Sequence, residues 1–234
     1  MKILIVLTSH DQLGNTGKKT GFWLEEFTTP YYILKDAGME ITLSSPKGGK
    51  PPIDPISDRP ENLTLSTKRF HQDSTAQSEL ANTKQLAEVS ASDFDAVFYP
   101  GGHGPMWDMP DNTASIALIE AFNKAGKPIV AVCHGPSVLV NVRGKECDYM
   151  VRGKRVTGFS NEEEDDVGCA EIVPFLLEDA LQERGAIYSK TDNWAPYVQV
   201  DGKLITGQNP ASAGPAAETL LKLIHDAEPV PPGI

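Results

Sequence analysis

The chain has 234 residues, of which 40% are hydrophobic, and carries a formal net charge of −11 at pH 7. This length and apolar content suit a single domain with a sizeable core. The negative charge repels nucleic-acid phosphates and anionic membrane surfaces, so neither is an expected partner.

The cysteines and the amino terminus indicate where the protein works. Cys133, Cys147 and Cys169 form no C-x-x-C pair, which argues against a disulfide framework and favours a reducing, cytoplasmic location. The first apolar run is too short for a signal peptide, and no stretch approaches the roughly 20 apolar residues that span a bilayer. We expect one domain over residues 1–228 and a loose tail over 229–234.

The first third of the chain alternates between strand and helix patterns. An aliphatic run predicts a strand over 2–8, and the polar, glycine-containing loop over 9–21 is placed to line a pocket. Helical spacing of large apolar residues predicts a helix over 22–37, and a second strand covers 39–45. The proline- and glycine-rich stretch 48–60 predicts an irregular excursion that caps a neighbouring surface.

The alternation continues to the carboxyl terminus. The same criteria predict helices over 78–89, 113–125, 172–184 and 211–227, strands over 94–100 and 128–132, a turn at 152–154 between short strands, and a hairpin of 198–200 with 204–205. This order predicts an α/β fold with a doubly wound, mainly parallel sheet, helices on both faces and a small β-hairpin addition.

One segment carries the strongest chemical signal, because a buried strand runs straight into a cysteine at a tight turn. Cys133 follows a run of β-branched and small residues, and Gly135-Pro136 then stops the strand and opens a helix. Ligands bind at this carboxyl edge in open α/β sheets, and a helix amino terminus favours a thiolate. A free cysteine is more often core, but His134-Gly135-Pro136 is a poor core strand, so we favour a nucleophile.

Other groups can complete a site around the cysteine. His134 is the nearest base, the alternative being a histidine that only caps or packs at the turn. The acidic run 162–166 is usually a solvated face, yet one inward member can fix the tautomer of a histidine. The turn Gly101-Gly102-His103-Gly104 ends the preceding strand and presents backbone N–H groups that suit an oxyanion hole, although alone it indicates only a flexible loop.

Five ordered blocks of the chain resemble the ThiJ/PfpI superfamily, whose fold is like that of class I glutamine amidotransferases. The blocks are Lys19-Thr20-Gly21 leading to Glu26, Gly101-Gly102-His103-Gly104, Ala131-Val132-Cys133-His134-Gly135-Pro136, Thr157-Gly158-Phe159, and Thr206-Gly207-Gln208-Asn209-Pro210-Ala211-Ser212. The first and last look most like the branch of glutathione-independent glyoxalases (glyoxalase III) and heat-inducible holding chaperones. The resemblance implies a flavodoxin-like core, usually a homodimer, that acts on methylglyoxal or early glycation adducts.

The resemblance also implies catalytic roles for individual positions. Cys133 matches the nucleophile, His134 its histidine partner, and Glu26 the acidic residue that hydrogen-bonds the sulfur. Glu164 aligns with the third member of the triad, within the acidic run 162–166.

Further positions match the surroundings of the nucleophile. Gly102 and His134 stand where backbone N–H groups hold the oxyanion, and we expect Gly101, His103 and Trp194 to contact substrate.

The position of Glu26 on its predicted helix supports its role as a proton shuttle. It follows Trp23 by three residues and so lies beside the apolar stripe, where burial raises the pKa of a carboxyl. The adjacent Glu25 is then the solvated one. His103 is a candidate metal ligand, but no second histidine accompanies Glu26, so we predict no metal and no other cofactor.

The expected reaction starts when the Cys133 thiolate adds to the aldehyde of a small α-oxoaldehyde. Glu26 or His134 then moves a proton between adjacent carbons through an enediol, and hydrolysis of the resulting thioester releases a 2-hydroxy acid, as in a glyoxalase III of the D-lactate dehydratase type or a deglycase. A holding chaperone would need an exposed apolar patch, and a PfpI-type cysteine amidohydrolase or peptidase would need a peptide cleft. An amidotransferase half would need a synthetase partner.

Overall fold

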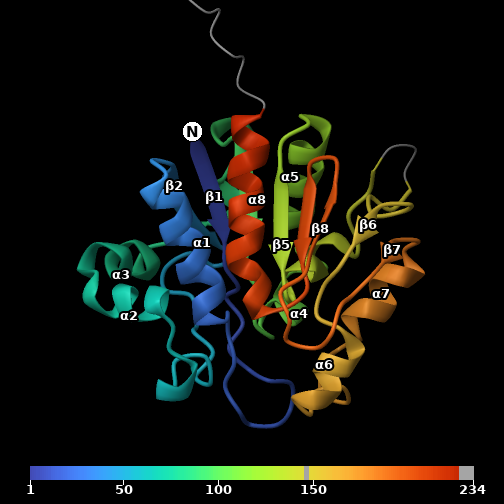
Figure 1. Ribbon diagram of the computed structural model, residues 1–234, viewed down its shortest axis with the longest axis horizontal. Coiled ribbons are helices and arrows are strands. Elements are labelled where there is room, and N and C mark those ends of the chain that lie inside the picture. The colour runs from blue at the N-terminus through green and yellow to red at the C-terminus, as the bar shows by residue number, and fades with distance from the viewer. Residues whose placement is uncertain (145–147, 227–234) are drawn as a thin grey trace, which may run out of the picture.

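The computed structural model describes residues 1–144 and 148–226. A seven-stranded sheet in the order β3-β2-β1-β4-β5-β9-β8 forms its centre, with helices on both sides (Figure 1). The large sheet contains β1 (Lys2–Val6), β2 (Glu40–Ser45), β3 (Lys84–Gln85), β4 (Ala96–Tyr99), β5 (Ile129–Val132), β8 (Val198–Asp201) and β9 (Leu204–Gly207); β6 (Arg155–Val156) and β7 (Ile187–Tyr188) pair separately. The helices are α1 (Leu24–Asp36), α2 (Leu65–Gln72), α3 (Ser74–Ala81), α4 (Pro105–Asp108), α5 (Thr113–Lys124), α6 (Asn161–Asp166), α7 (Leu177–Glu183) and α8 (Ala213–His225).

The pairing of the large sheet is parallel except at one edge. Strands β1, β4, β5 and β9 run parallel to one another, whereas β8 pairs antiparallel with β9. Strands buried on both faces favour continuous aliphatic runs, and β1, β4 and β5 have them. The expected flavodoxin-like, doubly wound α/β fold is confirmed. The hairpin turn at Asp201-Gly202 is also present, but its second strand β9 joins the sheet beside β5 and is not a mere addition.

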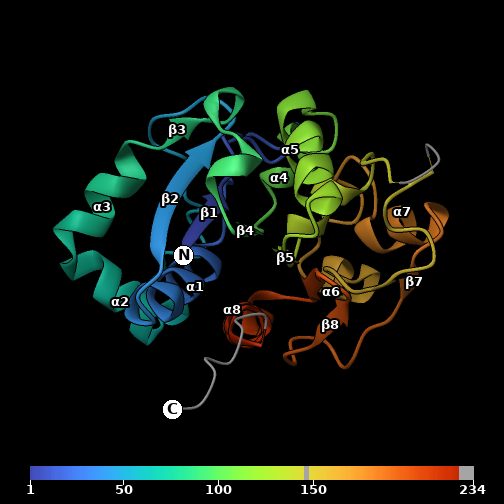
Figure 2. The ribbon, with the colours of Figure 1, turned by 90° about the horizontal axis from the view of Figure 1, so that it is seen from above.

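Two apolar layers cover the two faces of the sheet. One layer contains Phe27 and Tyr31 of α1 with Leu220 of α8, and these two helices lie side by side (Figures 1 and 2). The other layer contains Ile119 of α5 and Leu181 of α7. Burial of both sheet faces fixes the strands at the centre, so the loops after β1, β4 and β5 start from a rigid edge.

The region from 65 to 89 differs from the single helix predicted over 78–89. Two helices, α2 and α3, meet at Asp73, whose Oδ1 accepts the N–H of Ala76 at 3.0 Å and begins α3. A capping box between Thr64 and Thr67 begins α2. The prediction of a helix over 78–89 was wrong because these polar caps, rather than apolar periodicity, set the limits of the helices.

The helix predicted over 172–184 begins five residues later than expected, with α7. The N–H groups of Ile172 and Val173 both turn back to the carbonyl of Cys169, at 2.8 and 3.0 Å, so the chain forms turns there. The acidic run 162–166 falls within a helix that the sequence analysis did not predict, α6. The expected turn at 152–154 is present and leads into β6.

Two predictions fall outside the described residues, namely the loose tail over 229–234 and Cys147. Cys133 and Cys169 are both free and buried. Among the helices of residues 1–144 and 148–226, none has the length and apolar character needed to cross a membrane.

Candidate active site

Cys133 stands directly after β5, at the edge of the sheet where the parallel strands β1 and β4 also end. Its φ is +59°, in the left-handed region that non-glycine residues rarely adopt. The backbone is held in this conformation because its N–H donates to the carbonyl of Gly207 at 2.9 Å and its carbonyl accepts the N–H of Phe159 at 2.8 Å. The sharp turn directs the thiol away from the line of the strand, as a nucleophile elbow does.

The turn Gly101-Gly102 packs against the elbow so closely that side chains are excluded. A Cβ at Gly101 would lie 2.6 Å from the nitrogen of His134 and 2.8 Å from the Cβ of Cys133. Gly102 has φ +89°, and a Cβ there would lie 2.4 Å from the nitrogen of Trp23. These glycines therefore form a tightly packed wall rather than the flexible loop that a glycine pair alone would indicate.

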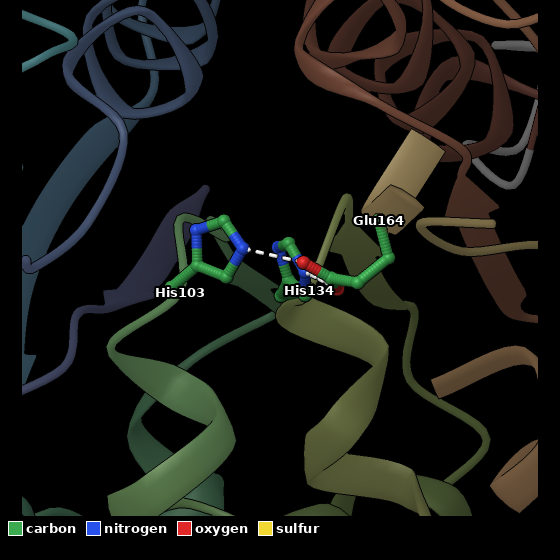
Figure 3. Close-up of side chains that lie close together, drawn as sticks. All are labelled: His103, His134 and Glu164. Carbon is green, nitrogen blue, oxygen red and sulfur yellow. Dashed lines mark hydrogen bonds and ion pairs between the residues drawn. The ribbon is translucent and has the colours of Figure 1, made fainter. Parts of the chain in front are cut away.

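A carboxylate and an imidazole are aligned behind the thiol. Sγ of Cys133 lies 3.4 Å from Nδ1 of His134, and Nε2 of His134 lies 2.7 Å from Oε2 of Glu164. The other oxygen, Oε1, lies 2.7 Å from Nε2 of His103, so Glu164 bridges both rings (Figure 3). A carboxylate can only accept, hence Nε2 of His134 carries the proton and the lone pair on Nδ1 faces the thiol.

The ionisation of these groups follows from their partners. Burial alone would raise the pKa of Glu164, but charge interactions and hydrogen bonds with His134 and His103 outweigh it and hold that pKa well below its usual range. Burial lowers the pKa of His134, so its ring is neutral at pH 7. A neutral imidazole beside an ionised carboxylate is a competent base for the thiol.

Two members of the acidic run turn inward, where one was expected. Ser160 caps α6 and forms a capping box with Glu163, and the next residue, Glu164, reaches the histidines. Oε1 of Glu163 also accepts the N–H of Trp194 and the side-chain N–H of Asn209, both at 2.9 Å. Glu163 therefore ties α6 to the block that contains Asn209 and holds Glu164 in place.

Glu26 approaches the cysteine from α1 and is fully buried. Its Oε2 accepts the N–H of Gly101 at 2.7 Å, while Oε1 is buried and makes no hydrogen bond within the described residues. The Cys133 thiol is close enough to the Glu26 carboxyl to influence its pKa. Burial raises the pKa of Glu26 to about 8, as its sequence position indicated, so the carboxyl is protonated at pH 7. Glu25, expected in solvent, is itself half-buried.

The expectation that the helix amino terminus beyond the turn favours a thiolate at Cys133 is wrong, because the pKa of the thiol is raised. The helix beyond the elbow is a 3₁₀ helix of five residues, Gly135–Leu139. Burial and the Glu26 carboxyl raise the pKa of the Cys133 thiol, and they outweigh the N–H of Gly102, which lowers it. The resting group is a thiol, and a thiolate forms when His134 takes the proton.

A cavity of about 360 Å³ opens beside His103. The loop 9–21 and the excursion 48–60 supply much of its wall, as their sequences indicated, and Trp23 and Cys169 also line it. Of the three residues expected to contact substrate, His103 lines this cavity and Gly101 and Trp194 do not. The loop of Trp194 is tied to Glu163, and its ring packs on Phe159 with centroids 5.7 Å apart.

Several groups of the site escaped the sequence analysis. Nothing in the spacing indicated that Cys169 reaches the cavity or that Glu163 braces α6, because both depend on turns after Ser160. His103 was expected to contact substrate, and its position in the Gly-Gly-His-Gly turn gave that signal, but its bond to Glu164 links residues that are far apart in sequence. One ligand atom from each of His103, His134 and Glu164 lies within 4.8 Å of the others, so these three side chains form a group that could hold a metal. A metal there would take Glu164 away from His134.

The sequence profile of the DJ-1/PfpI family matches residues 19–223. The chain belongs to the DJ-1/PfpI family. Glyoxalase 3 of Candida albicans is 29% identical in an alignment of 230 positions that covers 94% of this chain and 97% of that protein. Glutathione-independent glyoxalase HSP31 of Saccharomyces cerevisiae is 31% identical, with 91% and 93% covered.

Solved structures of this DJ-1/PfpI group superpose over nearly the whole chain. Rapid Encystment Protein 24 KDa (REP24) of Francisella tularensis has a TM-score of 0.91 and 40% identity, covering 95% of this chain and 98% of that one. Glyoxalase III of Candida albicans has a TM-score of 0.89 and 29% identity, covering 95% and 97%. The resemblance seen in the sequence is thereby confirmed at the level of family and fold.

Proposed function

We propose that the chain is a glutathione-independent glyoxalase that converts small α-oxoaldehydes such as methylglyoxal to 2-hydroxy acids, with Cys133 as the nucleophile. The observation that carries the proposal is the alignment of Cys133, His134 and Glu164, with a protonated Glu26 on the other side of the sulfur. Relatives named glutathione-independent glyoxalases, similar over almost their full length, support it.

In the first step His134 accepts the thiol proton at Nδ1 while the sulfur of Cys133 bonds to the aldehyde carbon. The carbonyl π electrons move to oxygen, which gives a hemithioacetal oxyanion. The backbone N–H groups of Gly102 and His134 are the proposed donors to that oxygen, because neither of them donates to a backbone acceptor within the described chain.

In the second step the proton on the former aldehyde carbon moves to the adjacent carbon through an enediol. The first carbon is oxidised and the second is reduced by the same two electrons, so no external oxidant or reductant takes part. For this the oxyanion first takes a proton from either Glu26 or His134, and the group that has given up its proton is then the base that carries the proton from the first carbon to the second. The hydroxyl proton on the first carbon passes to the oxygen of the second carbon, which leaves the thioester carbonyl on the first. Water then attacks the thioester and releases the 2-hydroxy acid and the free thiol.

The decisive experiment measures D- and L-lactate from methylglyoxal, with and without added glutathione, for wild type, Cys133→Ala and Cys133→Ser. We expect wild-type turnover to be independent of glutathione, and both variants to lose about 10³-fold or more in kcat/KM. Circular dichroism would check that the variants are folded. Full activity in either variant excludes the covalent mechanism, and no lactate from wild type favours the chaperone or amidohydrolase alternatives.

Two further predictions concern the oligomeric state and the location of the protein and do not affect the proposed reaction. We propose a homodimer, checked by sedimentation equilibrium at micromolar concentration, and a cytoplasmic location, checked by cell fractionation.

A further inference from the structure

The cavity beside His103 is much larger than methylglyoxal requires. Its volume is about 360 Å³, whereas a three-carbon oxoaldehyde displaces only a few waters of about 30 Å³ each. Pockets usually match the ligands that they enclose. The unused space therefore indicates a substrate with a longer body.

Much of the lining of the cavity is apolar. Leu13, Trp23, Ile56 and Val167 all contribute to it. Leu13 is buried and Trp23 is largely buried, so the surfaces that they expose to the cavity would mainly contact a bound ligand. An aryl or short alkyl body fits such a lining better than a polar chain does.

Cations stand at the rim of the same cavity, although the chain as a whole carries a net charge of −11. Lys18, Lys19 and Arg59 contribute them. Lys19 pairs with Asp11 at 2.5 Å. Lys18 and Arg59 are exposed, and within the described residues neither the ammonium of Lys18 nor the guanidinium of Arg59 forms an ion pair or a hydrogen bond.

The acidic group of the rim does not neutralise these cations by contact. Asp54 is buried, and its two oxygens accept the hydroxyl of Thr20 and the N–H of Ile56, both at 2.8 Å. Its carboxylate is turned toward the protein. The rim therefore presents two unpaired positive side chains to an incoming ligand.

We propose that this cavity selects α-oxoaldehydes that carry an apolar body and a terminal carboxylate or other anion, with Lys18 and Arg59 receiving the anion. The inference rests on the proposed glyoxalase function. The reacting carbonyl lies at the His103 end of the cavity, the body lies between Trp23 and Ile56, and the anion lies at the rim.

The test compares phenylglyoxal with 4-carboxyphenylglyoxal, two substrates that differ by one carboxylate. The ratio of their kcat/KM values is measured at low ionic strength for wild type and for the double variant Lys18→Gln/Arg59→Gln. Two exposed ion pairs predict a wild-type ratio about fivefold in favour of the carboxylate, falling to about one in the double variant. Added salt should lower the wild-type ratio toward one as well.

A matched control removes two cations elsewhere. Lys68→Gln/Lys124→Gln makes the same change in net charge at exposed lysines outside the cavity, and it should keep the wild-type ratio. An equal fall in both double variants would mean that only the overall charge matters and would overturn the proposal. A wild-type ratio of one or below would overturn it too.

The result is separable from the proposed function. Lactate from methylglyoxal tests that function alone. If wild type makes none, binding of 4-acetylbenzoate and acetophenone to Cys133→Ala, measured by calorimetry, tests the cavity instead. Lys18→Gln/Arg59→Gln should then weaken binding of 4-acetylbenzoate about fivefold and leave that of acetophenone unchanged, and equal binding of both compounds would contradict the inference.

Discussion

The two sides of Cys133 each bury a glutamate and treat it in opposite ways. On the α1 side, Glu26 is fully buried and its carboxyl accepts one backbone N–H, and burial raises its pKa to about 8. On the α6 side, Glu164 meets two imidazoles, and its pKa falls well below the usual range. The same residue type thus supplies a neutral acid on one side and a fixed anion on the other, because burial decides the charge of Glu26 whereas the two imidazoles outweigh burial at Glu164.

The largest effect is expected on the anionic side. Glu164→Gln replaces the carboxylate by an amide that no longer requires the proton on Nε2 of His134, so the ring can present the wrong tautomer to the thiol. We expect kcat to fall about 10³-fold with methylglyoxal. Glu164→Asp is the control, and it should recover part of the loss. A fall of less than tenfold in Glu164→Gln would show that His134 needs no carboxylate.

The neutral side should dominate the pH profile. Protonated Glu26 prevails below its pKa of about 8, so wild-type kcat/KM should decline as pH rises above that value. Glu26→Gln cannot ionise and should lose this alkaline limb, with activity at pH 7 reduced about tenfold or more. If the limb persists unchanged in Glu26→Gln, another group is responsible for it.

The same comparison extends to stability. The folded pKa of Glu26, about 8, exceeds its ordinary value of 4.5, so folding favours the protonated form. The free energy of unfolding should therefore decrease as pH rises between these two values, by about 1.4 kcal/mol per pH unit at most. Urea unfolding of wild type and Glu26→Gln at pH 5 and 7.5 checks this slope. Parallel behaviour of the two proteins would contradict it.

The smallest effect is expected at Trp194, which does not line the cavity. Trp194→Ala should change kcat/KM for methylglyoxal less than about twofold, whereas Trp23→Leu, on the cavity wall, should raise KM for phenylglyoxal several-fold. Steady-state kinetics on both variants measures the contrast. Equal losses would place Trp194 in the substrate path after all.

The central sheet and its edge were predictable from sequence because aliphatic runs and glycine turns act locally. The strand before Cys133 and the turn Gly101-Gly102 indicated where the site would be. The helices α2 and α3 were not predicted, since a capping box at Thr64 and the shared cap Asp73 set their limits. The spacing of apolar residues in these two helices is too weak a signal to predict them without the caps.

The sequence predicted which residues form the site, but it did not predict which of the two glutamates is ionised. Family resemblance indicated Glu26 and Glu164, and the structure brings both to Cys133. Which of them ionises depends on His103, whose ring reaches Glu164 across the fold, and on the burial of α1. Such long-range contacts leave no periodicity in the sequence. The position of Cys169 in the cavity wall likewise has no signal in the sequence.

The backbone of Cys133 and the wall of the cavity are held by separate sets of bonds. The elbow is fixed through Gly207 and Phe159. The wall is fixed through Thr20 and Asp54, and through the close approach of Gly21 to Pro52. Residues between these wall anchors can change in evolution or in the laboratory while the nucleophile keeps its geometry. Substrate range can therefore diverge among proteins that share one unaltered reaction centre.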